Sequence, residues 1–333
     1  MDHAAPILPP TAPAKVILHI DPRYHDRYHK AAHLAIFPLI EDIITRAGGQ
    51  VIIEPRPPLT LPRDMRWGDG DLHIVQGGMA RGVGYLNAGL AYLTGYWHLD
   101  AQGVLADSSA LGHTFDPAQM DANAASAFLT DLRARFVAPR ASRYRQAKDR
   151  ADDLPQGCIA VFLQGPGVAT RQQTYLGQKD MLRAVVQGAQ GRQVMVKAHP
   201  LRREHGAALM ADLRAEGLAF TEAHPNVHDL LAVCAVTVSI NSAVAIEGFL
   251  HGKPAILFGR SDFAGQVETV RRAQDFPAAL NSALTLPRDY APWLHWYFTQ
   301  VCIDITKCDA SARILAVFDE AGFDTVSLGL ARA

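Results

Sequence analysis

The sequence lacks the features that mark several common classes of protein. Its formal net charge is −1 over 333 residues, so it has no basic excess with which to neutralise a nucleic-acid backbone. Its four cysteines are scattered without Cys-x-x-Cys spacing. Cys158 and Cys234 lie in apolar, strand-like runs and are expected to be buried free thiols. Nothing in the cysteine content indicates an oxidising compartment.

Membrane and targeting signals are also missing. No apolar run reaches the length of a transmembrane helix. The N-terminus carries an acid and several prolines where a signal peptide needs a basic patch and an apolar stretch. We therefore expect a cytoplasmic protein. A basic run could bring it to anionic lipid at the inner face of the membrane, although a solvated helix and linker is the simpler interpretation. This run consists of Arg133, Arg135, Arg140, Arg143, Arg145 and Lys148.

Several catalytic signatures do not occur in this chain. The 14 histidines form no His-Glu-x-x-His or Cys/His zinc pattern, so no metal site is expected. The sequence also has no Walker A motif and no Gly-x-Ser-x-Gly elbow. Any function must therefore come from other polar residues.

What the chain does contain is a regular alternation of apolar runs and amphipathic segments. With 333 residues, 49% hydrophobic and 20% charged, it is long enough for two domains of about 150 residues each. Alternating strands and helices favour parallel sheets joined by right-handed crossovers. We predict an α/β protein with two Rossmann-like domains, residues 1–150 and 151–290, and a helical tail over residues 291–333.

The first domain is predicted from short apolar runs and three helical patterns. We expect strands at residues 15–20, 50–54, 71–75 and 91–93, and helices at residues 26–48, 84–90 and 121–136. Residues 1–10 are expected to be a loose arm and residues 55–62 a loop. The charged stretch 140–155 lacks a strand signal, so we place the domain boundary there.

The second domain shows the clearer alternation. We expect strands at residues 158–163, 193–197, 236–240 and 255–258, and helices at residues 180–187, 201–216, 226–234 and 242–251. Asn226 is expected to cap its helix, and a further helix is predicted at residues 311–321. Polar residues or glycines follow the strands, as they do where parallel strands end around a bound nucleotide.

A His-Pro pair at His199 follows the strand that ends at Lys197. An imidazole at this place can donate a hydrogen bond to a phosphate oxygen, and Lys197 with Arg202 or Arg203 could add positive charge. An isolated His-Pro pair is usually a turn. Its position between two other polar strand ends favours contact with a phosphate.

Ser239, Asn241 and Ser242 join the next strand to the next helix. Ser242 is expected at the helix N-terminus, where its hydroxyl and the free N–H groups form an anion site, or simply cap the helix. Glu247 follows on the same helix among apolar neighbours. It is expected either to accept hydrogen bonds from a ribose diol or to be a partly exposed surface glutamate.

Glycine turns follow one strand in each domain, at Gln164-Gly165 and at Gln76-Gly77. Glycine allows a close approach of the backbone to a ligand, but strands also end in glycine without binding anything. A polar cluster that includes His98 and Asp100 follows a predicted strand in the first domain. Such a cluster either holds a catalytic acid or base or belongs to a surface loop.

Together these blocks resemble the bacterial capsule polysaccharide biosynthesis family, whose members include β-Kdo transferases that use CMP-Kdo. The resemblance runs over residues 72–270. Some of the motifs also look like those of glycerophosphotransferases and sialyltransferase-like enzymes. The motifs are Gln76-Gly77, Gly95-Tyr96-Trp97-His98-Leu99-Asp100, Gln164-Gly165, Lys197-Ala198-His199-Pro200, Asn241-Ser242 with Glu247-Gly248, Gly252-Lys253-Pro254, and Gly259 with Phe263-Ala264-Gly265.

The resemblance implies a GT-B architecture, with two Rossmann-like domains whose parallel sheets face across a cleft. It implies a glycosyltransferase of capsular or surface polysaccharide synthesis that uses a nucleotide-sugar, a CMP-linked sugar such as CMP-Kdo being favoured. No further cofactor is implied, and the acceptor is a glycan or glycolipid. The donor phosphate is expected near His199 and Ser242, and the ribose near Glu247. The remaining donor-side residues are Gln164, Gly165, Lys197, Ser239 and Asn241; the acceptor-side residues are Gln76, Gly77 and His98.

The sequence departs from the family at one important place. The family usually carries acidic residues just before the positions of Gly95-Tyr96, and these are expected to supply the catalytic carboxylate. Here the positions hold Leu93 and Thr94, which cannot act as a carboxylate. Either Asp100 or Asp107 serves instead, or the chemistry has changed, or activity is lost. The alternatives are therefore a glycerol- or ribitol-phosphate transferase and a catalytically silent GT-B-like binding subunit.

Overall fold

The structure is a computed structural model, and it describes residues 12–56, 68–167 and 173–331. The predicted loose arm at residues 1–10 and most of the predicted loop at residues 55–62 lie outside these ranges. Within them, no helix is long and apolar enough to cross a membrane.

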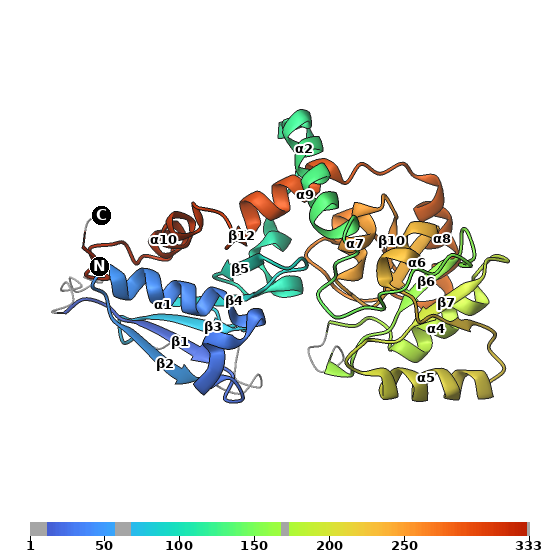
Figure 1. Cartoon of the computed structure of the whole chain (residues 1–333), viewed down its shortest axis with the longest axis horizontal. Helices are drawn as coiled ribbons and strands as arrows, with labels where there is room; N and C mark the ends of the chain where they lie inside the picture. The colour runs from blue at the N-terminus through green and yellow to red at the C-terminus, as the bar shows by residue number, and fades with distance from the viewer. Residues whose placement is uncertain (1–11, 57–67, 168–172, 332–333) are drawn as a thin grey trace, which may run out of the picture. The chain divides into compact units, whose positions relative to one another are not determined.

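The chain divides into two compact units, and each contains one six-stranded sheet (Figure 1). The first unit comprises residues 1–91, 95–109 and 301–333, and the second comprises residues 92–94 and 110–300. This division differs from the predicted boundary near residue 150. It also splits the predicted tail, because residues 291–300 belong to the second unit and the following residues to the first.

The sheet of the first unit has the order β12-β5-β4-β3-β1-β2. Its four strands β1 to β4 are parallel, and β5 pairs antiparallel with both β4 and β12. The strands are β1 (Val16–Ile20), β2 (Val51–Pro55), β3 (Leu72–Gln76), β4 (Tyr85–Leu90), β5 (Tyr96–Asp100) and β12 (Ile303–Asp304). All five residues of β1 are buried, as expected for a central parallel strand covered on both faces.

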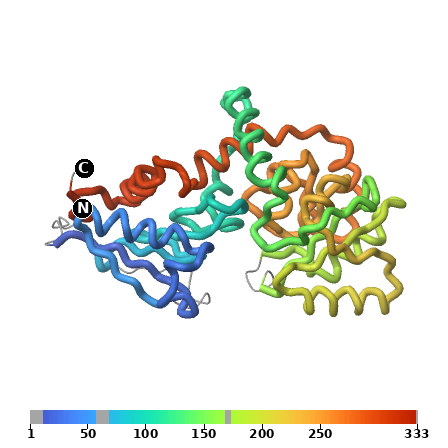
Figure 2. Tube along the Cα trace, in the orientation of Figure 1, coloured from blue at the N-terminus to red at the C-terminus, as the bar shows by residue number. Residues whose placement is uncertain are grey.

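Two helices complete the core of the first unit, α1 (Ile36–Arg46) and α10 (Ala310–Glu320). Apolar side chains of both helices, among them Ile40 and Phe318, share one buried cluster with the strands. Figure 2 shows the C-terminal segment of the chain returning beside the N-terminal one. Ala14 donates a backbone hydrogen bond to Ser327 there.

The sheet of the second unit has the order β11-β10-β9-β6-β7-β8, and all its neighbours are parallel. Its strands are β6 (Ile159–Phe162), β7 (Val194–Lys197), β8 (Thr221–Glu222), β9 (Val236–Ser239), β10 (Ala255–Leu257) and β11 (Glu268–Thr269). Its helices are α2 (Ala122–Leu132), α4 (Gln178–Gln187), α5 (Arg203–Ala215), α6 (Val227–Val233), α7 (Val244–Leu250), α8 (Phe276–Thr285) and α9 (Ala291–Trp296). The predicted βα alternation is therefore present.

Helix caps follow the sequence closely in this unit. The Asn226 side chain accepts the backbone N–H of His228 and begins α6, as predicted. The Asp121 carboxylate caps α2 in the same way, and a π-helical turn over Arg133–Val137 continues this helix. Cys158 and Cys234 are buried free thiols, as predicted.

Three predictions for the first unit were wrong. The predicted helix at residues 84–90 is instead the strand β4, which begins at Tyr85, because its backbone pairs with β3 and Asn87 bonds back to Ala80. Residues 91–93 are a bend, and the strand follows at β5. Residues 26–35 form short 3₁₀ turns before α1, because Ala31 is extended and interrupts the predicted long helix.

Candidate functional site

The carboxyl ends of the adjacent parallel strands β7, β6 and β9 bring most of the predicted donor-side residues together. In a doubly wound sheet, ligands bind at this edge. Gln164 and Gly165 follow β6, Lys197 ends β7 and His199 follows it. Ser239, Asn241 and Ser242 lie at and beyond the end of β9.

Gln164 and Asn241 form an amide clasp between β6 and β9. Gln164 Nε2 donates to Asn241 Oδ1 at 3.0 Å, and the Asn241 backbone N–H donates to Gln164 Oε1 at 3.0 Å. Gln178 binds both backbone groups of Gln164. These two predicted ligand-binding side chains therefore hold the strand ends in register.

His199 is prepared to donate a hydrogen bond. Its Nδ1 accepts the backbone N–H of Leu201 at 3.2 Å, so the proton of the neutral ring is on Nε2. Burial lowers the pKa of His199, and the nearby cations Arg202 and Arg143 lower it further. Tyr144 packs edge-on against the ring at 4.9 Å between centroids. The result is a neutral N–H donor beside two guanidinium groups, which suits a phosphate.

Gly165 makes room for one of these cations. A Cβ at Gly165 would lie only 3.2 Å from Cγ of Arg202, so a larger residue would push the arginine stem away. Glycine was predicted here because it lets the backbone come close to a ligand. In the structure, the group that comes close to Gly165 is the Arg202 side chain.

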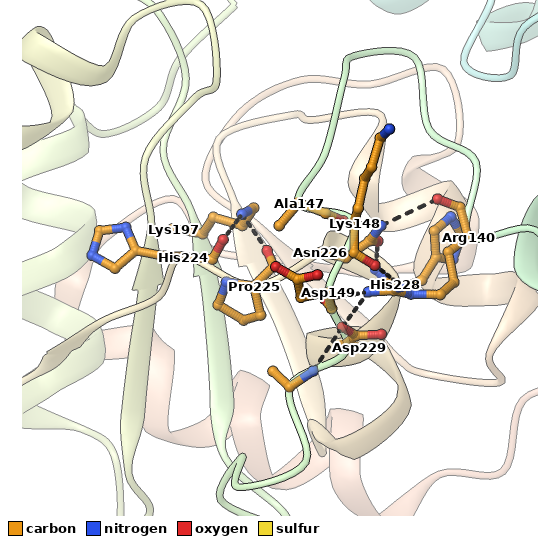
Figure 3. Close-up of polar contacts among 11 residues, drawn as sticks. Arg140, Ala147, Lys148, Asp149, Lys197, His224, Pro225, Asn226, His228 and Asp229 are labelled. Carbon is orange, nitrogen blue, oxygen red and sulfur yellow. Dashed lines mark hydrogen bonds and ion pairs between the residues drawn. The ribbon is translucent and has the colours of Figure 1, made fainter.

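Lys197 has an internal task in this structure. Its ammonium donates to the carbonyl oxygens of Pro225 at 2.5 Å and His224 at 3.4 Å (Figure 3). Burial lowers the pKa of Lys197, and Arg203 adds to the effect. Lys197 therefore positions the turn after β8 against the end of β7.

The serines after β9 cap the chain locally. Ser239 Oγ accepts the backbone N–H of Ser242 at 3.1 Å, and Ser242 Oγ accepts that of Val244 at 3.3 Å. Helix α7 begins at Val244 with Ala243 as its N-cap residue, so Ser242 lies one residue before the cap position and its hydroxyl binds the first N–H of the helix. Since these bonds use only oxygen lone pairs, the hydroxyl hydrogen of Ser242 can still donate to a ligand.

Glu247 is buried, with a relative exposure of 3%, so the alternative of a surface glutamate is wrong. Its Oε1 accepts a hydrogen bond of 2.6 Å from Ser142 Oγ. Its Oε2 is buried and has no hydrogen-bond partner among the described residues. Burial raises the pKa of Glu247 to about 7, although the bond from Ser142 opposes the shift.

A pocket of about 700 Å³ adjoins these strand ends within the second unit. It lies between the segment around Tyr144 and the loop that carries His199. A smaller pocket of about 340 Å³ shares part of the same segment and includes Ser142 and Asn226. The larger pocket is lined by Tyr144, Arg145, Gln146, Ala147, Lys197, Ala198, Pro200, Leu201, Arg203, Glu204, Ala207, Glu222, Ala223 and His224.

The wall of both pockets is the segment 139–148, which the sequence suggested as a linker. Arg140 donates to Asp229 at 2.6 Å and to the carbonyl oxygens of Lys148 and Asp149 (Figure 3). Asn226 Nδ2 donates to the carbonyl oxygens at both ends of the segment, at 3.2 and 3.3 Å. The segment is therefore a built part of the second unit.

These contacts also correct the predicted basic face. Arg140 is paired with Asp229, and Arg133 donates to the carbonyl oxygen of Leu250 at 2.8 Å. Arg143, Arg145 and Lys148 remain exposed. Only part of the run could meet an anionic surface, and Arg143 lies beside His199 instead.

In the first unit, Gln76 organises the carboxyl ends of β1, β2 and β3. Its Oε1 accepts the backbone N–H of Asp21 at 2.7 Å, and its carbonyl accepts a hydrogen bond from Arg56. Arg56 and Arg23 both bind the Asp21 carboxylate. The hydrogen bond from Arg23 lowers the pKa of Asp21 to about 2. Gly77 follows with a φ of +56°. The sequence did not indicate this ion cluster, because Arg56 and Gln76 are far from Asp21 and Arg23 in the chain.

The other two candidates of the first unit are enclosed. His98 is fully buried within β5. The Asp100 carboxylate accepts the backbone N–H groups of Gln102, Gly103 and Ser109, and the hydroxyl of Ser109 at 2.6 Å. Four donors occupy both of its oxygens, so Asp100 stabilises the turn after β5 and has no free oxygen for acid–base chemistry.

Leu93 is buried, and no carboxylate occupies this position. The preceding residue, Tyr92, donates its hydroxyl proton to Asp262 within the second unit. Tyr297 binds the other oxygen of Asp262 at 2.6 Å. A buried carboxylate therefore contacts this part of the chain, but two tyrosines hold it.

Comparison with known proteins gives a likeness in structure alone. No known family profile and no curated protein sequence match the chain. Solved structures similar to it over most of their lengths include two transferases. The structure described as Thermosulfurimonas dismutans KpsC, beta Kdo 2,4 transferase, aligns with a TM-score of 0.55 and 14% identity, over 87% of this chain and 92% of that one. Its beta Kdo 2,7 transferase counterpart aligns with a TM-score of 0.51 and 12% identity, over 93% and 99%.

The chain has the fold of these transferases. The predicted α/β class with two Rossmann-like, GT-B-like units is therefore confirmed. Because the sequence identities are low, this structural likeness confirms the fold that the motifs indicated.

Proposed function

We propose that this protein is a glycosyltransferase of capsular or surface polysaccharide synthesis. It would transfer a sugar from a nucleotide-activated donor, with CMP-Kdo as the first candidate, to a glycan or glycolipid. The observation that carries the proposal is His199, a neutral N–H donor at the end of β7 with Arg143 and Arg202 beside it. The fold shared with two β-Kdo transferases supports it.

The phosphate of the donor would bind at this group of residues. His199 Nε2–H and the Ser242 hydroxyl can donate to its oxygens, and the two arginines would stabilise the charge that builds up on the departing phosphate. Because His199 and Ser242 are held by backbone hydrogen bonds before the ligand arrives, these two donors need little reorganisation. We propose no further cofactor.

The nucleoside would occupy the adjoining pocket. Its volume of about 700 Å³ lies within the range of about 300–1,000 Å³ that is usual for small-molecule sites. Tyr144 offers an aromatic surface in this pocket. The family resemblance suggests Glu247, which does not line the pocket, as the acceptor of a hydrogen bond from the ribose. The exposed Arg145 and Lys148 are consistent with work at the inner face of a membrane, where anionic lipids attract basic residues.

A second candidate function is donor binding without turnover. It is favoured by Leu93 and Thr94, which replace the expected acid, and by Asp100, whose oxygens are fully bonded. A silent subunit would keep the phosphate site and lose the catalytic carboxylate.

Calorimetric titration with CMP, CDP, UDP and GDP tests the donor site. We expect selective binding of CMP, and a loss of about tenfold or more in His199→Ala, since a hydrogen bond to a charged group is removed. His205→Ala is the matched control, because His205 is an exposed histidine of the neighbouring helix α5. If no nucleotide binds, the transferase proposal fails. If CDP-glycerol, titrated in the same way, binds better than CMP, a glycerol- or ribitol-phosphate transferase is the better function.

Turnover then separates the enzyme from the silent subunit. Release of CMP from CMP-Kdo in the presence of an acceptor glycan would establish transfer. Tight binding of CMP with no release of product would establish the binding subunit.

A further inference from the structure

One wall of the larger pocket carries a carboxylate to which no described residue donates a hydrogen bond. This is Glu222, which ends β8 and whose side chain is 29% exposed. Arg214 Nη1 and His224 Nε2 each lie 3.8 Å from one of its oxygens, which is too far for a hydrogen bond. Glu222 can therefore accept a hydrogen bond from a ligand in the pocket.

Glu222 is held in place by the sheet. It pairs with Val196 of β7, and the next residue, Ala223, donates its backbone N–H to the Val196 carbonyl oxygen at 2.8 Å. The Lys197 ammonium binds two carbonyl oxygens of the turn that follows β8 (Figure 3). Strand and turn are therefore both tied to β7, and the carboxylate is positioned before any ligand binds.

The order of the strands places the base of a bound nucleotide, rather than its phosphate, at Glu222. This part of the sheet has the order β9-β6-β7-β8, with neighbouring strands about 4.8 Å apart. In the proposed function the phosphate binds between Ser242, after β9, and His199, after β7. The pocket continues from the loop of His199 in the opposite direction, to the edge strand β8. A nucleoside in the pocket therefore extends toward β8, and the base is its part farthest from the phosphate.

The charge at this end of the pocket also suits a base. A carboxylate repels a phosphate, but it attracts an uncharged group that donates a hydrogen bond. Cytosine carries an amino group, N4, at the place where uracil carries a carbonyl oxygen, O4, and carboxylates are the usual acceptors for N4. Uracil would place its O4 against the negative charge of Glu222.

We propose that Glu222 recognises the nucleobase of the donor by accepting a hydrogen bond from its amino group, and so makes the site select cytosine over uracil. The inference rests on the proposed function, because it assigns the base to that same nucleotide site. Glu222 touches the ligand and determines its specificity, whereas the phosphate is bound elsewhere, at His199 and Ser242.

The test compares the affinities of the full chain for CMP, UMP and 2-pyrimidinone riboside 5′-monophosphate, which lacks both the amino group and the carbonyl oxygen at this place. Calorimetric titration measures all three. In the wild type we expect CMP to bind about tenfold more tightly than either of the others, as for a hydrogen bond to a charged group. Glu222→Gln should reduce the preference for CMP over UMP to about twofold, because an amide can accept from N4 or donate to O4. Glu222→Ala is a second variant and should lose the preference in the same way.

Glu204→Gln is the matched control. Glu204 is an exposed glutamate of α5 that lines the same pocket, so this variant removes the same charge from the same surroundings. We expect it to change the affinities for CMP and UMP by the same factor and to leave their ratio at the wild-type value. A ratio that falls in Glu204→Gln as much as in Glu222→Gln would overturn the inference, because the effect would then come from net charge.

Further outcomes separate the inference from the proposed function. A Glu222→Gln protein that keeps the wild-type preference for CMP would overturn the inference and leave the nucleotide site intact, and so would a wild type that binds CMP and UMP equally. If the variant keeps the base preference but loses discrimination against 2′-deoxy-CMP, Glu222 binds the ribose and the inference fails. Absence of any nucleotide binding in the wild type would overturn the proposed function and the inference with it.

Discussion

Glu247 is a buried carboxyl group, and burial destabilises its ionised form because it removes the charge from water. Its pKa is raised to about 7 by burial, from an ordinary 4.5. Between these two values the folded state binds more protons than the unfolded chain, so the free energy of unfolding falls as the pH rises. Below about pH 4.5 the carboxyl is protonated in both states, so its burial costs no ionisation energy. Above about pH 7 the full cost of burying an ionised carboxylate applies.

We therefore predict that Glu247→Gln gains stability relative to the wild type as the pH rises. The difference between the two proteins should change by roughly 3 kcal/mol between pH 4.5 and pH 8, since one pKa unit corresponds to about 1.4 kcal/mol. Urea unfolding at several pH values measures this change. Glu204→Gln, at an exposed glutamate, should show no such trend. A pH-independent difference for Glu247→Gln would mean that this carboxyl ionises normally.

Single residues could be predicted where the signal is local. His199 and Ser242 follow strands, and a strand end is visible in the apolar pattern before it. Ser142 and Tyr144 could not be found in this way, because their importance depends on contacts with Glu247 and His199 that only the folded chain creates. Asp100 shows the opposite error. It has the right residue type, but neighbouring backbone groups use both of its oxygens.

At the scale of elements, the segment 139–148 depends on one ion pair. The side chains of Arg140 and Asp229 are 15% and 12% exposed, so solvent screens them only partly. We predict that Arg140→Ala and Asp229→Ala each destabilise the second unit by about 2 kcal/mol, because each leaves a largely buried charge unpaired.

A double-mutant cycle isolates the pair. We expect a coupling energy of about 1–2 kcal/mol from urea unfolding of the two single variants and the double variant. Amide hydrogen exchange should speed up across residues 141–149 in each single variant, since the segment loses its tie to α6. A coupling energy near zero would show that the hydrogen bonds from the Asn226 side chain to the backbone of the segment suffice to hold it.

Helix α5 approaches the His199 loop through a glycine. A Cβ at Gly206 would lie 2.7 Å from the Cβ of Ala198, which is too close for two methyl groups. We predict that Gly206→Ala destabilises the protein by about 1–3 kcal/mol through overpacking, although alanine is the better helix former by about 1 kcal/mol. The altered loop should also bind CMP more weakly.

The compensating change is Ala198→Gly, which removes the other methyl group. Thermal unfolding and CMP titration of Gly206→Ala, Ala198→Gly and the double variant measure the effect. We expect the double variant to recover most of the stability and affinity that Gly206→Ala loses. If it recovers neither, the clash is not the cause.

The elements of the second unit were largely predictable, because parallel strands buried on both faces give continuous apolar runs. The four predicted strands there coincide with β6, β7, β9 and β10. The strands β8 and β11 have two residues each and leave no pattern to detect. In the first unit, the sequence of β4 does not favour a strand, because its residues include no β-branched side chain. Its pairing with β3 overrides that local preference.

At the scale of the whole molecule, each unit is assembled from distant parts of the chain. The first unit needs residues 301–333, because Ile303 pairs with β5 and α10 contributes Ile314 and Phe318 to the core. Composition places a boundary in the charged stretch 140–155. It cannot show that a segment near residue 140 is pinned to α6, or that the C-terminus returns to the N-terminal sheet. Both facts are long-range contacts with no signature in local sequence.

We predict that the cores of the two units respond separately to mutation. Phe318 is fully buried in the first core and Phe276 in the second, so truncation of either to alanine should cost about 3–5 kcal/mol. Phe318→Ala should raise amide hydrogen exchange in β1 and leave β6 and CMP binding close to the wild type. Phe276→Ala should do the reverse and weaken CMP binding, since it loosens the sheet whose strand ends hold His199. If Phe318→Ala deprotects β1 and β6 equally, the chain unfolds as one cooperative body, and the proposed nucleotide site depends on the C-terminal helix as much as on its own sheet.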